Sequence, residues 1–352
     1  MKKRKLLFLS VLFVLIATLF LSSCIVHNTN KAKKIPVYGN YRLAGSGTAT
    51  HGKEQVLFRD IIGPAIKDEG YTVNEGGPFM TTVGTYYGNN YFFMCKFFQE
   101  QVGEMHSTGY WDYRTEYCFG TVDLVTLKVH IFCIAENVVM SPSGIMNVLV
   151  YKFENLIIYS VDRKYFEIVN ADTLDRVSAD VEVPEDYTLC YASEDMMLFK
   201  DRTEDNYFTV NYNTGERDDE QTPSLIEKLN AESYVEYDGK NYVLDIADEA
   251  VTFTERDADN SFSVTIDELR ERSEEFRKVE QIFDCKLTFN NALVQNGEIY
   301  LSASYYDPPA WGMTMYSKCS TVACFLYEPE TSTFKYIGWL QPEATLMSVI
   351  KL

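Results

Sequence analysis

The sequence predicts an all-β fold built from repeated four-stranded antiparallel units, and three observations lead to it. The chain holds 25 Tyr and 22 Phe among its 352 residues, and aromatic residues favour strands over helices. From about Pro36 onward, short apolar runs are separated by Gly, Asn and Asp. Two kinds of turn then alternate strictly along the chain, five times each. Repeats of about 40 to 50 residues with four short strands each are typical of a β-propeller.

The two kinds of turn have different compositions. Both suit hairpins, because their residues tolerate left-handed backbone angles or bond to their own backbone. The first kind joins an incoming strand to a strongly apolar one, at Gly88-Asn89-Asn90, Glu154-Asn155, Glu194-Asp195, Asp238-Gly239-Lys240 and Asn296-Gly297. The second kind usually holds Asp or Asn with Thr, at Asp123-Leu124-Val125-Thr126, Asn170-Ala171-Asp172-Thr173, Tyr212-Asn213-Thr214-Gly215, Asp257-Ala258-Asp259-Asn260 and Glu328-Pro329-Glu330-Thr331.

These turns define the predicted blades, each a sheet of four strands. Five complete blades are expected at about 78–135, 138–182, 187–220, 232–264 and 285–341. Residues 36–75 and 344–352 remain, and a sixth blade shared between them closes the ring without open strand edges. Seven blades, with a separate blade in residues 36–75, is the alternative. Segments such as Phe166 to Leu174 resemble the outer hairpins of bacterial propeller repeats.

Irregular spacing between the turns identifies two inserts. In the second, third and fourth blades the two kinds of turn lie 17 to 19 residues apart, whereas in the first and fifth blades they lie more than 30 apart. The excess falls between the second and third strands of both blades, at Gln99 to Thr115 and Tyr305 to Ser320.

A third irregularity predicts an amphipathic helix over 266–283, on the connection between the fourth and fifth blades. A capping box over Thr265 to Glu268 begins it,. Apolar residues then recur at helical spacing, at Ile266, Leu269, Phe276, Val279 and Ile282,. Two ion pairs between residues four apart support it, Glu268 with Arg272 and Glu274 with Lys278,.

The two inserts and the helix are expected on one face of the propeller, because strands reverse direction at every turn. Aromatic rings beside a few charged groups suit stacking against sugars or peptide side chains. The predicted ligand-binding residues are His106, Tyr110, Trp111, Asp112, Tyr113 and Arg114 in the first insert, and Tyr305, Tyr306, Asp307, Trp311 and Tyr316 in the second. The alternative is that these aromatic side chains pack onto their own blades as small cores.

The N-terminal segment predicts where the chain works. Lys2 to Lys5 are basic, and the mainly apolar run from Leu6 to Phe20 is too short to span a bilayer comfortably but suits a secretory signal,. Leu21-Ser22-Ser23-Cys24 then resembles the lipobox of bacterial lipoproteins. The resemblance implies cleavage before Cys24 and its acylation, so that residues 1–23 are a signal peptide, 24–35 a tether and 36–352 a single propeller domain on the extracytoplasmic face of a cell membrane. An ordinary cleaved signal or a short membrane anchor is the alternative.

Charge and cysteine content limit the partners. Without its signal the chain keeps 28 of 32 basic and all 51 acidic residues, a formal net charge of −23. Such a surface repels nucleic acid phosphates and anionic lipid headgroups, so the expected membrane contact is the lipid anchor alone. Seven cysteines remain besides Cys24 and none belong to a C-x-x-C pair. Free core thiols are therefore favoured over one or two disulfides.

Signals of catalysis are mostly missing from the sequence. It contains no G-x-S-x-G, H-E-x-x-H or G-x-x-x-x-G-K motif, and its four histidines are far apart, with His51 and His106 the plausible functional ones,. No catalytic residue, metal site or cofactor is predicted. The favoured hypothesis is a lipid-anchored propeller that binds a glycan, peptide or protein. The alternative is a propeller glycoside hydrolase or polysaccharide lyase, in which carboxylates such as Asp112 and Asp307 are candidates,.

Overall fold

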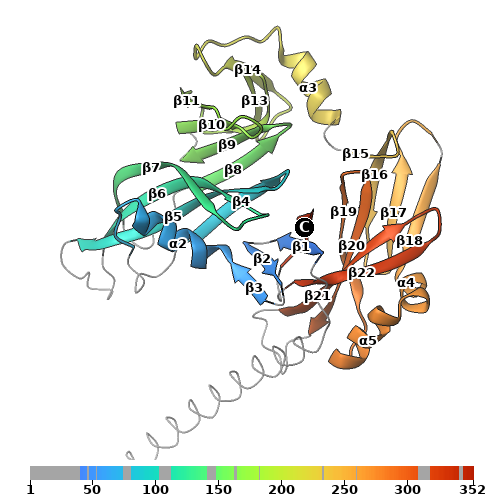
Figure 1. The fold of residues 1–352 in the computed structure, drawn as a ribbon. Coiled ribbons are helices and arrows are strands. Elements are labelled where there is room, and N and C mark those ends of the chain that lie inside the picture. The colour runs from blue at the N-terminus through green and yellow to red at the C-terminus, as the bar shows by residue number, and fades with distance from the viewer. Residues whose placement is uncertain are drawn as a thin grey trace, which may run out of the picture. The chain divides into compact units, whose positions relative to one another are not determined.

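The chain folds into two compact units, one made mainly of residues 47–235 and the other mainly of residues 244–349, which we call the N-terminal and C-terminal units. The computed structural model describes residues 40–45, 47–52, 54–73, 81–102, 112–140, 148–161, 165–181, 183–231, 234–258, 260–307, 318–340 and 344–352. Within each unit the strands form separate antiparallel sheets whose members follow one another along the chain (Figure 1).

The N-terminal unit contains three of these sheets. Their strands are β4 (Thr81–Tyr87), β5 (Asn90–Val102), β6 (Asp112–Asp123) and β7 (Val129–Met140), then β8 (Val148–Phe153), β9 (Leu156–Val161), β10 (Tyr165–Asn170) and β11 (Arg176–Asp180), and finally β12 (Tyr187–Ser193), β13 (Met196–Asp201) and β14 (Tyr207–Asn211). Aromatic side chains join neighbouring sheets, as where Phe119 packs on Tyr159 at 5.1 Å between ring centroids.

The C-terminal unit contains two further four-stranded sheets. Their strands are β15 (Val235–Tyr237), β16 (Lys240–Ile246), β17 (Ala250–Glu255) and β18 (Ser261–Thr265), then β19 (Thr288–Gln295), β20 (Glu298–Asp307), β21 (Lys318–Glu328) and β22 (Thr333–Leu340). The predicted blades 232–264 and 285–341 match the sheets of β15–β18 and β19–β22 closely. The predicted blade 138–182 begins too early, because residues 138–140 belong to β7 and β8 begins at Val148, and the predicted blade 187–220 extends beyond the last strand of its sheet, which ends at Asn211.

A sixth sheet has the order β23-β1-β2-β3. It combines β1 (Tyr41–Gly45), β2 (Thr48–His51) and β3 (Glu54–Leu57) with the C-terminal strand β23 (Ser348–Lys351). The predicted pairing of the C-terminal segment with N-terminal strands is therefore present, and the Met347 amide also donates to the Ala44 carbonyl at 2.9 Å. Antiparallel sheets of three or four strands, repeated in this way, match the blades of a β-propeller.

Turns of the first kind are two-residue hairpin loops, as predicted. Their first residue has a positive φ in every sheet where the loop is described, because such turns follow the right-handed twist of the strands. These residues are Gly88 (53°), Glu154 (48°), Glu194 (52°), Asp238 (50°) and Asn296 (53°).

Turns of the second kind are held by side chains that bond to nearby backbone. The Asp123 carboxylate accepts from the amides of Val125 at 2.7 Å and Thr126 at 2.9 Å, and the Thr126 hydroxyl accepts from the Lys128 amide at 3.3 Å. The same pattern recurs from Asn170 and from Asn211. Because Asp, Asn and Thr make these local bonds, their presence in the sequence indicated where the turns lie.

The two turns of one sheet are also bonded to each other, an arrangement we call the turn bracket. The Leu124 amide donates to the Asn89 carbonyl at 2.7 Å. The Ala171 amide donates to the Asn155 carbonyl at the same distance, and the Asn155 side chain adds a bond to Asp172 at 2.9 Å. A third bracket joins Tyr212 to Asp195 at 2.9 Å. The bracket closes one end of each of these sheets.

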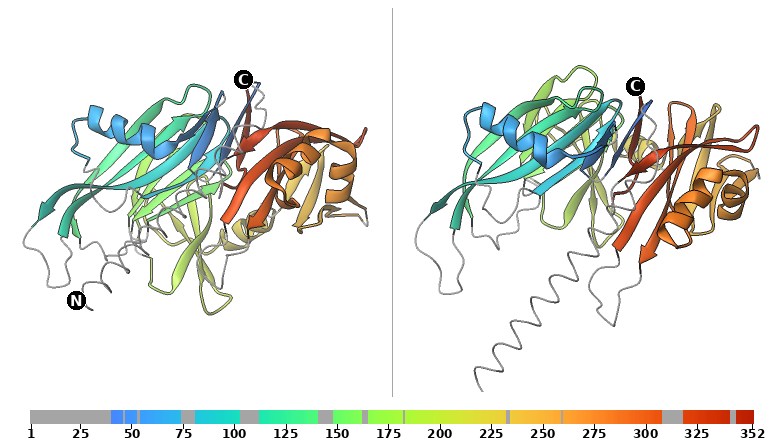
Figure 2. Two further views of the ribbon diagram at one scale, coloured as in Figure 1. Left: turned by 90° about the horizontal axis from the view of Figure 1, so that it is seen from below. Right: turned by 60° about the horizontal axis from the view of Figure 1, so that its bottom comes forward.

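Residues 58–68, which the sequence analysis assigned to strands of a shared blade, form a helix instead, α2 (Phe58–Asp68). Phe58, Ile62 and Ile66 lie four residues apart and are 0% exposed, so they form one apolar stripe. The helix lies along the sheet of β4 to β7, with the Phe58 ring 4.6 Å from that of Tyr91 (Figure 2).

The third sheet departs from the predicted four strands, because β14 is followed by a single bridge between Val210 and Arg217 rather than by a fourth strand. The helix α3 (Thr222–Ala231) comes next. The acidic run Asp218-Asp219-Glu220 has no apolar alternation with which to form a strand. Leu225 is 5% exposed and joins the core of this sheet.

The segment 266–283 forms two helices rather than the single one predicted, α4 (Ile266–Arg272) and α5 (Glu274–Phe283). Ser273 separates them with extended angles, φ −108° and ψ 116°, and its hydroxyl accepts from the Phe276 amide at 3.1 Å. The predicted capping box is present, with Glu268 bonding back to Thr265. Arg272 donates to the Ser332 carbonyl at 2.8 Å, so the expected pairing with Glu268 is replaced.

Candidate ligand-binding hairpins

The second insert continues the β20–β21 hairpin beyond its own sheet. The last residue of β22, Leu340, pairs with Val322, and the first residue of β19 pairs with Ser304. Beyond these pairs, the pairing of β20 with β21 continues to Asp307 and Lys318. The insert therefore begins as a two-stranded ribbon projecting from one end of the sheet.

The first insert also begins as a continuation of a hairpin, the β5–β6 pair of the N-terminal unit, but a third strand lies beside it. The flanking strand β4 ends where Thr81 pairs with Lys96, whereas β5 and β6 continue to the pair Val102 and Asp112. Strand β7 accompanies β6 as far as Tyr113. The register shifts between Phe98 and Gln101 in this ribbon, and between Ser304 and Tyr306 in the other. Such bulges bend and twist a hairpin away from its sheet.

The structure places the backbone of five predicted ligand-binding residues on these ribbons. Asp112, Tyr113 and Arg114 lie at the start of β6, and Tyr306 and Asp307 lie at the end of β20. Five others lie outside the described residues, at His106, Tyr110, Trp111, Trp311 and Tyr316. Cys24 and the predicted signal and tether also lie outside them.

Tyr305 lies in the core at the root of the second ribbon. Its side chain is 8% exposed, and its ring centroid lies 5.4 Å from that of Phe283 in α5. The Tyr305 side chain therefore packs against α5. The predicted helical segment contributes to this region by supporting the root of the ribbon.

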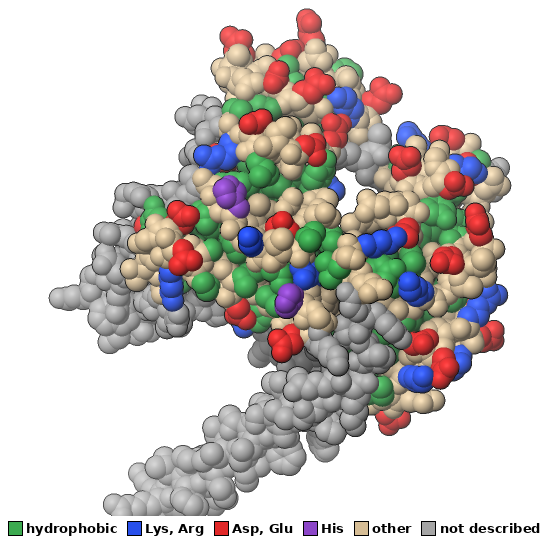
Figure 3. Space-filling model, in the orientation of Figure 1, with side chains coloured by type: hydrophobic (Ala, Val, Ile, Leu, Met, Phe, Trp, Pro, Cys, Tyr) green, Lys and Arg blue, Asp and Glu red, His purple; other side chains and the backbone are tan. Residues whose placement is uncertain are grey.

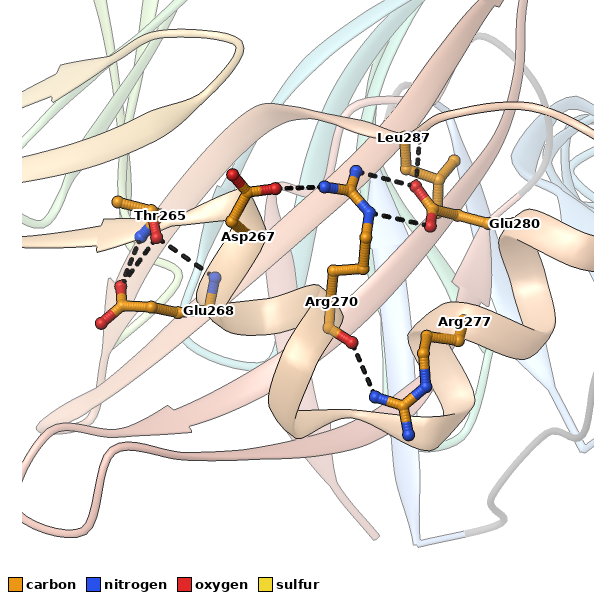
Figure 4. Close-up of polar contacts among 7 residues, drawn as sticks. All are labelled: Thr265, Asp267, Glu268, Arg270, Arg277, Glu280 and Leu287. Carbon is orange, nitrogen blue, oxygen red and sulfur yellow. Dashed lines mark hydrogen bonds and ion pairs between the residues drawn. The ribbon is translucent and has the colours of Figure 1, made fainter.

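The two helices are held together by a polar network on the side of the C-terminal unit (Figure 4). The Arg270 guanidinium donates two bonds to Glu280, each 3.0 Å long, and also contacts Asp267. Glu280 and Asp267 raise the pKa of Arg270 above its ordinary value. Glu280 further accepts from the Leu287 amide at 3.0 Å, and Arg277 donates to the Arg270 carbonyl at 2.7 Å. The network fixes the connection that leads into β19.

A shallow hollow of about 590 Å³ adjoins this network. Its lining residues are Arg270, Arg277, Glu280, Gln281, Asp284, Cys285 and Lys286. Because Arg270 and Glu280 are already paired with each other, the hollow is best explained as the surface between α4 and α5.

A smaller hollow of about 210 Å³ lies at the turn end of the β19–β22 sheet. In this sheet, Pro329 occupies the position of Leu124 and Ala171, whose amides donate the backbone bond of the turn bracket in the first and second sheets. Proline has no amide hydrogen, so this bond cannot form here. Gly297 stands where the second sheet has Asn155, so the side-chain part of the turn bracket is lost as well. The hollow's lining residues are Tyr237, Gly297, Glu298, Ile299, Leu326, Tyr327, Glu328, Pro329, Glu330 and Thr331.

Acidic side chains are spread over the face seen in Figure 3, as the net charge predicts. Within the described ranges, no group of three or more His, Cys, Asp and Glu side chains is arranged to hold a metal ion. No helix among the same residues is both long enough and apolar enough to cross a membrane.

No protein family and no curated protein matches the chain. Among solved structures, the chain is similar to the dihydro-heme d1 dehydrogenase NirN in complex with DHE, at 8% identity over 90% of this chain and 76% of that one, with a TM-score of 0.29. It is also similar to an oligogalacturonate lyase in complex with manganese, at 9% identity over 77% and 75% with a TM-score of 0.23. The Cps50 (Swd1) β-propeller domain of Myceliophteria thermophila matches at 8% identity over 75% and 73%, also with a TM-score of 0.23. Because every TM-score is below 0.5, the description of the fold rests on the sheets themselves.

Proposed function

We propose that this chain is a lipid-anchored, extracytoplasmic β-propeller that binds a glycan, peptide or protein ligand. In this proposal the six sheets are the blades of a closed ring, residues 1–23 are a cleaved signal peptide and Cys24 carries the lipid. The ligand binds to the two hairpins of the inserts, so that the rigid sheets hold a recognition surface away from the membrane.

The observation that carries the binding proposal is the pair of β-ribbons, β5–β6 and β20–β21. The β20–β21 pair extends past the described ends of both flanking strands, whereas the β5–β6 pair extends past the described end of β4 with β7 beside it. Each is bent by a bulge, and each connects the second and third strands of its sheet. The segments beyond the ribbons, 103–111 and 308–317, contain Trp111 and Trp311. Tryptophan offers a large stacking face, and it is enriched among residues that dominate binding energy.

The test begins with the purified mature chain on glycan and peptide arrays, followed by titration of the strongest ligand. Replacing Trp111 or Trp311 with alanine is expected to raise Kd about 5-fold to 150-fold, corresponding to about 1–3 kcal/mol for an aromatic anchor. The free energy of unfolding is expected to change far less. Release of shortened products from an arrayed polysaccharide would instead support the hydrolase or lyase alternative, with Asp112 and Asp307 as the first carboxylates to replace.

The third tryptophan, Trp339, is the matched control. It lies in β22 and is 8% exposed, so Trp339→Ala is expected to cost about 3–5 kcal/mol of stability. If Trp111→Ala and Trp311→Ala behave like Trp339→Ala and leave affinity unchanged, their side chains are structural and the binding proposal fails.

The anchor is tested by Cys24→Ala. Because acylation requires the Cys24 thiol, the variant is expected to leave the membrane fraction or to accumulate unprocessed. Detergent partition and intact mass distinguish these outcomes from the lipidated wild type. A correctly cleaved variant that stays on the membrane would contradict the anchor.

A further inference from the structure

Two buried cysteines face each other across the ladder between β5 and β6. Cys95 and Cys118 are directly opposed in the register, and both side chains are 0% exposed. Neither cysteine is part of a disulfide in this structure. Because directly opposed residues of an antiparallel pair project to the same face of the sheet, the two sulfur atoms lie on one side of it.

The separation of opposed residues in an antiparallel pair is compatible with a disulfide. Opposed residues in antiparallel strands have their Cα atoms about 4.5 or 5.5 Å apart, depending on the hydrogen-bonding pattern. Both values lie within the range of about 4.4–6.8 Å spanned by disulfides. Cys324 differs, because its partners in the neighbouring strands are Ser302 and Gly338.

We propose that Cys95 and Cys118 form a cross-strand disulfide when the chain folds in an oxidising compartment. The compartment rests on the proposed extracytoplasmic function, whereas the pairing rests on the ladder alone. The chemistry requires a disulfide oxidant, such as oxidised glutathione. The Cys95 thiolate attacks it and releases one glutathione thiol, and the Cys118 thiolate then attacks the mixed disulfide and releases the second. Two protein thiols are oxidised while one glutathione disulfide is reduced.

The helix α2 determines when this reaction can occur. Tyr91, Cys95 and Phe97 are separated along β5 by even numbers of residues. Their side chains therefore lie on the same face of the sheet. Phe58 of α2 packs on Tyr91, and Tyr71, just beyond α2, packs on Phe97 with ring centroids 6.2 Å apart. The helix segment therefore covers the thiols once folding is complete. The disulfide forms before α2 packs, and it is afterwards shielded from reductants.

The cross-link would support the first ribbon. The pair of Cys95 and Cys118 lies one residue from Lys96, which forms the last described pair between β5 and β4. The two strands that continue to Val102 and Asp112 would then be covalently joined at their root. This restricts how far the ribbon can separate from its sheet.

The test refolds the full chain from denaturant with reduced and oxidised glutathione, alkylates free thiols under denaturing conditions and digests without reduction. Trypsin cleaves after Lys67, Lys96, Arg114 and Lys128, which leaves Cys95 and Cys118 in separate peptides, 68–96 and 115–128, with no other cysteine. Mass spectrometry is expected to find these two peptides linked and Cys324 alkylated. Recovery of both peptides fully alkylated would overturn the proposal.

A stability measurement on the same material provides a second readout. The oxidised protein is expected to have a Tm about 5 °C or more above that of protein refolded with dithiothreitol, because the bond closes a loop between residues 95 and 118. An equal Tm would contradict a stabilising cross-link. The same mapping on protein isolated from cells tests the location separately. A link formed with glutathione but missing in cells would support the pairing and count against the proposed compartment.

Discussion

Removal of residues 344–352 is expected to cost the protein most of its stability. Leu346, Val349 and Ile350 are 0%, 2% and 3% exposed, and burying such side chains contributes about 1.5–3 kcal/mol each. The segment is also bonded through its backbone, because Asn291 donates to the Leu346 carbonyl at 2.6 Å and the Val349 amide donates to Gln295 at 3.0 Å. The combined loss of about 5–9 kcal/mol approaches the whole stability of a typical domain.

Chemical denaturation followed by tryptophan fluorescence measures this effect. The control deletes Leu352 alone, which is 56% exposed and is expected to change the unfolding midpoint very little. A chain without residues 344–352 that unfolds at the wild-type denaturant concentration would show that the pairing of β23 with β1 contributes nothing.

Gly120→Ala is expected to destabilise the sheet of β4 to β7 strongly. An added Cβ would lie 2.5 Å from the His130 carbonyl oxygen and 2.7 Å from Cζ of Phe93. The carbonyl belongs to the paired strand β7 and Phe93 is 0% exposed, so neither can move aside freely. Overpacking of this kind costs about 1–3 kcal/mol.

Gly63→Ala in α2 is the matched control, and its effect is expected to be much smaller. Beyond its chain neighbours and its own helix, no heavy atom lies within 4 Å of an added Cβ there. The preference of about 0.5–1 kcal/mol for alanine over glycine inside a helix is opposed by contact of that Cβ with the following Pro64,. Thermal unfolding should therefore show a much larger fall in Tm for Gly120→Ala than for Gly63→Ala. A Gly120→Ala protein with the wild-type Tm would mean that β6 and β7 separate at no cost.

Most of the β architecture could be predicted because local side-chain chemistry determines it. Asp123, Asn170 and Asn211 bond to the backbone of their own turns, so their effect can be read without knowledge of the tertiary structure. The elements that were missed depend on competing signals. In α2, Gly63 and Pro64 obscured a helical stripe, because both residues are poor helix formers.

The positions of the two inserts in the chain were predicted, but their form was not. Turn spacing located both inserts, yet it did not reveal that their first residues continue the ladders, as Val102 and Asp307 do. Burial of the Tyr305 ring depends on Phe283, which lies 22 residues earlier in the sequence. The hollow beside Gly297 and Pro329 lies where two bonds of the turn bracket found in the second sheet cannot form. It could not be predicted, because those bonds join turns that are far apart in the sequence.

The turn bracket also determines where this protein can change in length during evolution or engineering. A residue added at Asn89 or Asn155 would displace a carbonyl that the opposite turn needs, so both hairpins would have to adjust together. At the other end of the same sheets, the described pairs end at Val161 with Tyr165 and at Val102 with Asp112. Foreign peptides are therefore best grafted there. Natural insertions are expected to accumulate at that same end while the bracketed turns keep their length.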